Sequence, residues 1–116
     1  MRIADGVFRR TRILLMKDIL QRIRTDDNPE LPSGVSIGQK MVDEFIAYTE
    51  TKTMGTKTTV VRCVLRNGFE IVESTGCVDE KNYSEKIGYE ICMERIKNKI
   101  WELLGFLLQM AWNGIQ

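Results

Sequence analysis

The residues of this chain best suited to binding chemistry are two arginines and an aromatic residue, Arg62, Arg66 and Phe69. Arginine suits phosphate because its planar guanidinium group donates two parallel hydrogen bonds. An aromatic ring stacked on a base contributes roughly 1–3 kcal/mol in proteins that bind single-stranded nucleic acids. The nearly neutral charge of the chain does not argue against a small phosphorylated ligand, which needs only two or three well-placed cations.

A tight hairpin is predicted to position these side chains. Two apolar-rich strands flank Asn67-Gly68, and a two-residue loop of this kind needs positive φ at both central positions. Side-chain alternation along the ribbon then places the arginines and the aromatic ring on one side. The predicted cross-strand partners are Arg66 with Phe69, Val64 with Ile71, and Arg62 with Glu73. A simple Arg62–Glu73 ion pair, worth a few tenths of a kcal/mol, is the alternative to ligand binding.

Composition narrows the class of protein. At 116 residues, with 43% hydrophobic and 28% charged residues, the chain is predicted to be one soluble domain over 1–116. The net charge of +1 argues against a dedicated duplex-binding protein, whose affinity requires many phosphate contacts. The start of the chain does not resemble a secretory signal, and its longest apolar stretch is too short to cross a bilayer.

The lack of histidine and of a CxxC pair limits the catalytic and metal-binding chemistry that the chain can perform. The chain has no histidine, so a Ser-His-Asp or Cys-His catalytic set is excluded, and we predict that the protein is not an enzyme. Cys63, Cys77 and Cys92 are widely spaced and form no CxxC pair, so no metal site and no cofactor is predicted. Three thiols without a disulfide framework suit a reducing cytoplasm.

The first half of the chain, 1–55, is predicted to be helical. Apolar residues at helical spacing indicate a helix over Arg12–Arg24, whose polar face carries Arg22 and Arg24 as a weak second anion site. Ser36 opens a second predicted helix, with a stripe that extends to Tyr48. The threonine-rich run that follows, around Gly55, is predicted to turn into the first strand of the hairpin.

One long amphipathic helix over about 84–112 follows the hairpin. Gly88 and Gly105 lie within it, and close packing is the expected reason, because glycine costs about 1 kcal/mol relative to alanine in a helix. Its last third, WELLGFLLQMAW, is apolar on more than one face. We therefore expect a homo-oligomer that uses this segment; the alternative is that the N-terminal helix covers it within one chain.

The predicted fold class is α+β: an antiparallel β-hairpin or small sheet packed with a long C-terminal helix and two N-terminal helices. The part over 56–116 also carries a resemblance. Its ordered motifs are Asn67-Gly68-Phe69, Glu73-Ser74, Cys77-Val78-Asp79, Asn82-Tyr83, Ile87-Gly88 and Trp101-x-x-Leu104-Gly105-Phe106-Leu107-Leu108. In this order they resemble the small phage proteins of the gene product 49 / gene product 66 family. The pattern departs at Val72, Glu80 and Tyr83, where glycine, proline and phenylalanine are usual.

That family looks like the group containing the Thoeris anti-defence protein one. The resemblance implies an oligomeric phage sponge in the cytoplasm of the bacterial host. Such a sponge holds a cyclic ADP-ribose isomer without cleaving it, and some members also hold cyclic oligonucleotides. The net charge and the length of the apolar stretches, rather than the resemblance, predict no duplex nucleic acid and no membrane as partners. The alternative is a phage accessory protein that binds a host protein through its apolar C-terminal helix.

For such a ligand, the resemblance leads to specific expected roles. Phe69 or Tyr83 stacks on adenine, Asp79 accepts a hydrogen bond from a ribose hydroxyl, and phosphate is bound by one of three arginines, Arg62, Arg66 or Arg95. Structural alternatives stay open. Arg95 fits a solvated helix face, Asp79 is a favoured helix cap, and Tyr83 suits a hydrophobic staple at the start of the helix.

Overall fold

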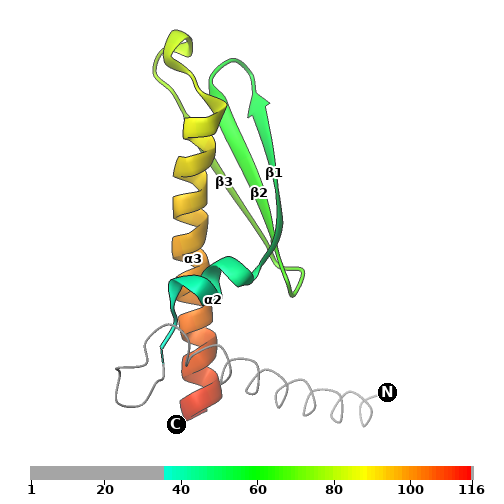
Figure 1. The fold of residues 1–116 in the computed structure, drawn as a ribbon, viewed down its shortest axis with the longest axis vertical. Coiled ribbons are helices and arrows are strands. Elements are labelled where there is room, and N and C mark those ends of the chain that lie inside the picture. Colours follow the sequence, from blue (N-terminus) through cyan, green and yellow to red (C-terminus); the bar gives the residue numbers. More distant parts are fainter. Residues whose placement is uncertain (1–35, 116) are drawn as a thin grey trace. The chain divides into compact units, whose positions relative to one another are not determined.

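The computed structural model describes residues 36–115. The predicted helix over Arg12–Arg24, with Arg22 and Arg24, lies outside the described residues. The chain divides into two compact units, and each is described by itself. Residues 42–101 form one unit, which contains the sheet and the first half of the long helix (Figure 1). The other unit includes residues 36–41 and 102–115.

The order of elements confirms the α+β class. A short helix α2 (Gln39–Glu44) precedes three strands, β1 (Ile46–Met54), β2 (Thr58–Leu65) and β3 (Glu70–Gly76). A 3₁₀ turn η1 (Glu80–Asn82) then leads into helix α3 (Glu85–Asn113). The strands form an antiparallel sheet in the order β1-β2-β3. The hairpin is therefore part of a three-stranded meander.

Strand β1 corrects the prediction of a helix from Ser36 to about Tyr48. The helix ends at Glu44, and the chain is extended from Ile46 onward. Three threonines in the nine-residue strand explain the difference, because β-branched side chains fit a pleated strand better than a helix. The apolar spacing that suggested a helix is a coincidence of residues that lie on two different elements.

The turn between β2 and β3 is also different from the prediction. Only Gly68 has positive φ, at +87°, so Asn67 does not fit the two-residue loop that needs positive φ at both positions. The Leu65 N–H donates to the Phe69 carbonyl oxygen at 2.8 Å, which closes a three-residue loop instead. One extra loop residue shifts the register by one. Arg62 therefore faces Val72, Cys63 faces Ile71, and Val64 faces Glu70.

The core lies between the sheet and the first half of α3. From β2, alternate side chains of Val61, Cys63 and Leu65 are buried, and α3 contributes every fourth residue, Cys92, Ile96 and Ile100. These α3 residues lie on one face of the helix, as the amphipathic pattern predicted. On the opposite face of the sheet, Tyr48 and Val72 are exposed.

Gly88 sets the distance between helix and sheet. A Cβ built on Gly88 would lie 2.1 Å from Thr59 Oγ1 and 2.6 Å from Thr59 Cβ, far inside van der Waals contact. Thr59 is fully buried, so its side chain has no free space into which it could move. Close packing at Gly88 is confirmed, whereas at Gly105 a Cβ would meet no atom of the described residues within 4 Å.

Capping hydrogen bonds determine where α3 begins and ends. Ser84 Oγ accepts a hydrogen bond from the Ile87 N–H at 3.3 Å, which satisfies one of the free donors at the helix start. At the other end Gly114 has φ of +63°, and its N–H donates to the Met110 carbonyl oxygen at 2.9 Å. This left-handed cap confirms the predicted stop at Asn113-Gly114.

Candidate functional site

Arg62 is the best-partnered of the predicted ligand residues. Its Nη1 lies 3.0 Å from Glu50 Oε1, its Nε donates to Glu70, and its guanidinium lies 5.9 Å from the centre of the Tyr48 ring. The hydrogen bond to Glu70 is the main reason that the pKa of Arg62 is raised. The predicted pair with Glu73 is wrong, because the partners of Arg62 come from strands on both sides of it.

Glu73 points to the other face of the sheet and pairs with Lys99 of α3. Arg95, one helical turn before Lys99, donates from Nη1 to the Ser74 carbonyl oxygen at 3.0 Å. Arg95 is exposed, as the alternative of a solvated helix face predicted. Its guanidinium nevertheless links α3 to β3 through this hydrogen bond. Together these contacts hold the helix against that edge of the sheet.

Asp79 caps the 3₁₀ turn. Its Oδ1 accepts a hydrogen bond from the Lys81 N–H at 2.9 Å, as the capping alternative predicted. The Asp79 carbonyl oxygen also accepts hydrogen bonds, from the Asn82 N–H at 3.0 Å and from Cys77 Sγ at 3.2 Å. Asp79 therefore organises the β3–α3 connection through its carbonyl oxygen and one of its two carboxylate oxygens.

Tyr83 belongs to a chain of hydroxyl groups. Its Oη lies 2.7 Å from Thr53 Oγ1 and 2.7 Å from Thr59 Oγ1, and Thr53 Oγ1 donates to Glu85 Oε2 at 2.6 Å. Each hydroxyl has one proton to donate. Since Thr53 gives its proton to Glu85, Tyr83 must donate to Thr53, and Thr59 must donate to Tyr83. The Tyr83 hydroxyl thus links β1, β2 and the start of α3.

Arg66 and Phe69 are the two predicted ligand residues whose exposed side chains lie on the same loop. Both are exposed on the loop between β2 and β3, and Phe69 is 52% exposed. Asn67 Oδ1 accepts from the Phe69 N–H at 3.0 Å, and the Arg66 N–H donates to the Phe45 carbonyl oxygen at 3.0 Å. Their backbone is therefore held in place. Within residues 36–115, the Arg66 guanidinium has no recorded partner.

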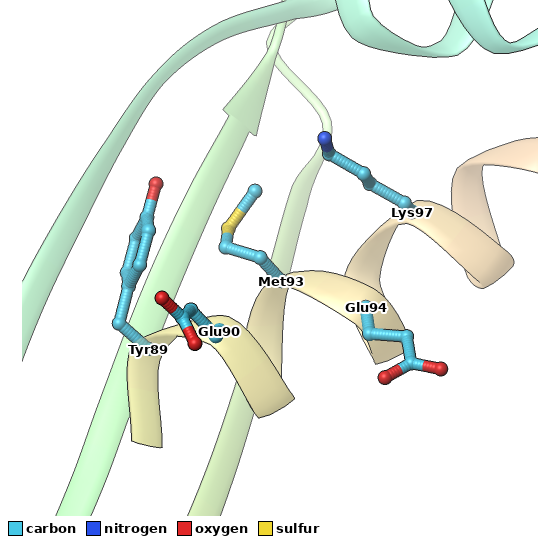
Figure 2. A pocket seen from close by; sticks show the side chains of 5 residues that line it. All are labelled: Tyr89, Glu90, Met93, Glu94 and Lys97. Atoms are coloured by element: carbon cyan, nitrogen blue, oxygen red, sulfur yellow. The ribbon is translucent and has the colours of Figure 1, made fainter. Parts of the chain in front are cut away.

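A hollow of about 400 Å³ lies on the flank of α3, and its lining was not predicted. Figure 2 shows Tyr89, Met93 and Lys97 rising in a row from one side of the helix, beside Glu90 and Glu94. A ring and a thioether can pack against an apolar surface, and the carboxylates can accept hydrogen bonds. The spacing of four residues along one helix face is the sequence feature that could have indicated this lining.

The cation of this hollow is already paired. Lys97 Nζ lies 3.0 Å from Asp43 Oδ1, and in Figure 2 the amine points towards α2. An anionic ligand would have to compete with Asp43, while Glu90 and Glu94 would repel it. The hollow is therefore less suited to phosphate than the loop that carries Arg66.

Two of the three thiols, those of Cys63 and Cys92, are buried. Burial raises the pKa of Cys63 and of Cys92, so both stay protonated near neutral pH. Among the described residues, no group of three or more metal-ligating side chains lies together. Over the same part of the chain, none of the helices combines the length and the apolarity that a bilayer crossing requires.

Comparison with known proteins identifies the family. Residues 37–112, more than half of the chain, match the phage protein family described as N4 Gp49/phage Sf6 gene 66, and the chain belongs to that family. The match begins well before the part that carries the motifs, because it also covers α2 and β1. Searches of curated proteins and of solved structures returned no match.

Proposed function

We propose that this phage-family protein binds and sequesters a cyclic ADP-ribose-type signalling nucleotide without degrading it. In this proposal it works in the cytoplasm of the bacterial host and keeps the signal from the effector of Thoeris immunity. Membership of the phage family supports the setting. The motif resemblance to the Thoeris anti-defence group supports the ligand class, and cyclic oligonucleotides are possible further ligands on the same grounds.

The exposed pair on the β2–β3 loop is the observation that carries the proposal. Arg66 and Phe69 flank a loop whose backbone is fixed by hydrogen bonds, so neither side chain has to be ordered from a mobile segment. A guanidinium fork can take a pyrophosphate oxygen pair, and a half-exposed ring offers a face to adenine. These are the two contacts that a cyclic ADP-ribose most needs.

The other predicted residues do not gather around this pair: Asp79 and Tyr83 lie at the opposite end of the sheet, where Tyr83 bonds to Thr53 and Thr59. Arg62 and Arg95 could exchange a protein acceptor for a phosphate oxygen, since both side chains reach solvent. Asp79 and Tyr83 hold the connection to α3 in shape. A sponge must hold its ligand at nanomolar affinity, about −12 kcal/mol, which calls for a more enclosed site than one exposed loop. The proposal therefore includes a homo-oligomer whose subunits together close the site.

A paired substitution tests the proposal. We expect calorimetry to detect tight binding of a cyclic ADP-ribose isomer to the full chain, and mass spectrometry to recover the same molecule intact after heating. Phe69→Ala should weaken binding by about 5- to 150-fold, because a stacking face worth roughly 1–3 kcal/mol is lost. Phe106→Ala is the matched control, since Phe106 is also exposed, at 69%, but lies on α3; sedimentation of this variant must show the same oligomer as the unmodified chain. No binding by the unmodified chain would reject the proposal.

The same pair of variants tests a second function. Leu103, Phe106 and Met110 are exposed along the last turns of α3 at a spacing that places them on one helix face. This stripe supports an accessory protein that binds a host protein through its C-terminal helix. In that case Phe106→Ala should abolish capture of one host protein from a lysate, and Phe69→Ala should leave the capture intact.

A further inference from the structure

Strand β1 is a long edge strand with unused hydrogen-bonding groups. The Leu65 N–H donates to the Phe69 carbonyl oxygen, and the Cys77 N–H donates to the Lys57 carbonyl oxygen, so the odd-numbered residues of β2 bond to β3. Alternation then directs the even-numbered β2 residues to β1, opposite its own even-numbered residues. In the described sheet, the backbone groups of Thr49, Thr51 and Thr53 consequently point outward from the edge.

The side-chain types of β1 are arranged symmetrically about Thr51, except that an acid on one side corresponds to a base on the other. From Tyr48 to Met54 the order is apolar, threonine, acid, threonine, base, threonine, apolar. Thr51 lies at the centre, with Glu50 on one side and Lys52 on the other. Tyr48 and Met54 are 50% and 55% exposed, although both are large and apolar. The edge therefore carries an apolar side chain at each end of a strand whose charges are complementary under a two-fold rotation.

We propose that two copies of this protein join edge to edge through β1, antiparallel and centred on Thr51, to form a continuous six-stranded sheet. In this register Glu50 of each copy lies opposite Lys52 of the other. Tyr48 lies opposite Met54, where the thioether packs on the ring. The outward backbone groups of Thr51 then bond to their counterparts, and those of Thr49 bond to Thr53 of the other copy.

The alternative registers are disfavoured by charge and by overlap. A two-fold axis at Glu50 would place the two Glu50 carboxylates opposite each other, and an axis at Lys52 would oppose the two ammonium groups. An axis at Thr49 or at Thr53 avoids the like pairs but loses both opposite-charge pairs and shortens the overlap. Lysine on an edge strand usually discourages pairing. In the register centred on Thr51, each Lys52 instead meets a carboxylate.

Sedimentation of the full chain tests the interface. We expect a dimer, or a larger assembly of dimers, and Thr51→Pro should abolish it, because proline removes the outward N–H and leaves the bonds to β2 intact. Val72→Pro is the matched control on the outer edge of β3 and should leave the assembly unchanged. Lys52→Glu should raise the dissociation constant at least tenfold by opposing Glu50. Adding Glu50→Lys to that variant should restore part of the affinity, because the opposite charges face each other again while the Glu50–Arg62 ion pair within each copy is lost.

Disulfide cross-linking between copies identifies which residues face each other across the interface. In a background carrying Cys77→Ser, Thr51→Cys should give a disulfide-linked dimer under mild oxidation, because paired strands place opposite Cα atoms about 5.5 Å apart. Thr49→Cys should not, since its counterpart lies four residues along the partner strand. A monomeric chain would overturn the interface. So would an assembly that withstands both Thr51→Pro and Lys52→Glu, or cross-linking that is equal at positions 49 and 51. Nucleotide binding is measured separately and can fail while this result stands.

Discussion

Gly88→Ala is the substitution on which the packing argument depends most. The new methyl carbon would lie 2.1 Å from Thr59 Oγ1 and 2.6 Å from Thr59 Cβ. Atoms at these distances cannot coexist, so α3 must move off the sheet or Thr59 must rotate. Thr59 is fully buried and is hydrogen-bonded to Tyr83, which makes either response costly.

The magnitude follows from three opposing contributions. Replacing glycine by alanine inside a helix gains about 1 kcal/mol of helix propensity. Overpacking costs about 1–3 kcal/mol, and loss of the Thr59–Tyr83 hydrogen bond costs about 1 kcal/mol. The net effect of Gly88→Ala is a loss of about 1–3 kcal/mol in the free energy of unfolding. Thr59→Ala, added to Gly88→Ala, should recover only part of this loss, because the Thr59 Cβ remains in the way.

Gly105→Ala is the matched control in the same helix. Among residues 36–115 a Cβ there meets nothing within 4 Å, so the propensity gain of about 1 kcal/mol is the expected effect. Urea unfolding followed by circular dichroism at 222 nm measures both variants, and the slope with denaturant should not change. We expect the midpoint to fall for Gly88→Ala and to rise for Gly105→Ala. Shifts of the same sign would refute the reasoning that helix–sheet contact requires a glycine at 88.

Three further results are expected. Tyr83→Phe should lower the free energy of unfolding by about 1–2 kcal/mol, since it removes the hydroxyl that joins two buried or half-buried threonines; urea unfolding measures this, and an unchanged midpoint would contradict the hydroxyl chain. Gly68→Ala should cost about 1–2 kcal/mol from its φ of +87° alone, and an equally stable variant would show that the loop relaxes. A thiol reagent should label Cys77 at once, whereas Cys63 and Cys92 are buried and should react only at the rate of opening or unfolding. Because burial raises the pKa of both buried thiols, their unfolded forms ionise first, and stability should fall as pH rises above about 8.5.

The sequence by itself determined the features that depend on near neighbours along the chain. The long helix follows from apolar residues every third or fourth position, and its ends follow from Ser84 and Gly114. The preference of aspartate for cap positions also predicted a capping role for Asp79, beside a ligand contact. The exposure of Arg66 and Phe69 follows from their place beside a turn.

Only the tertiary structure decided the features that depend on strand pairing. One more residue in the β2–β3 loop than predicted moved Glu73 to the helix side of the sheet, where it meets Lys99 rather than Arg62. The partners of Arg62 come from β1 and β3, and β1 was itself predicted partly as helix. Local periodicity carries no information about which strand lies alongside, because a cross-strand contact is settled by loop length and by burial on the opposite side of the sheet.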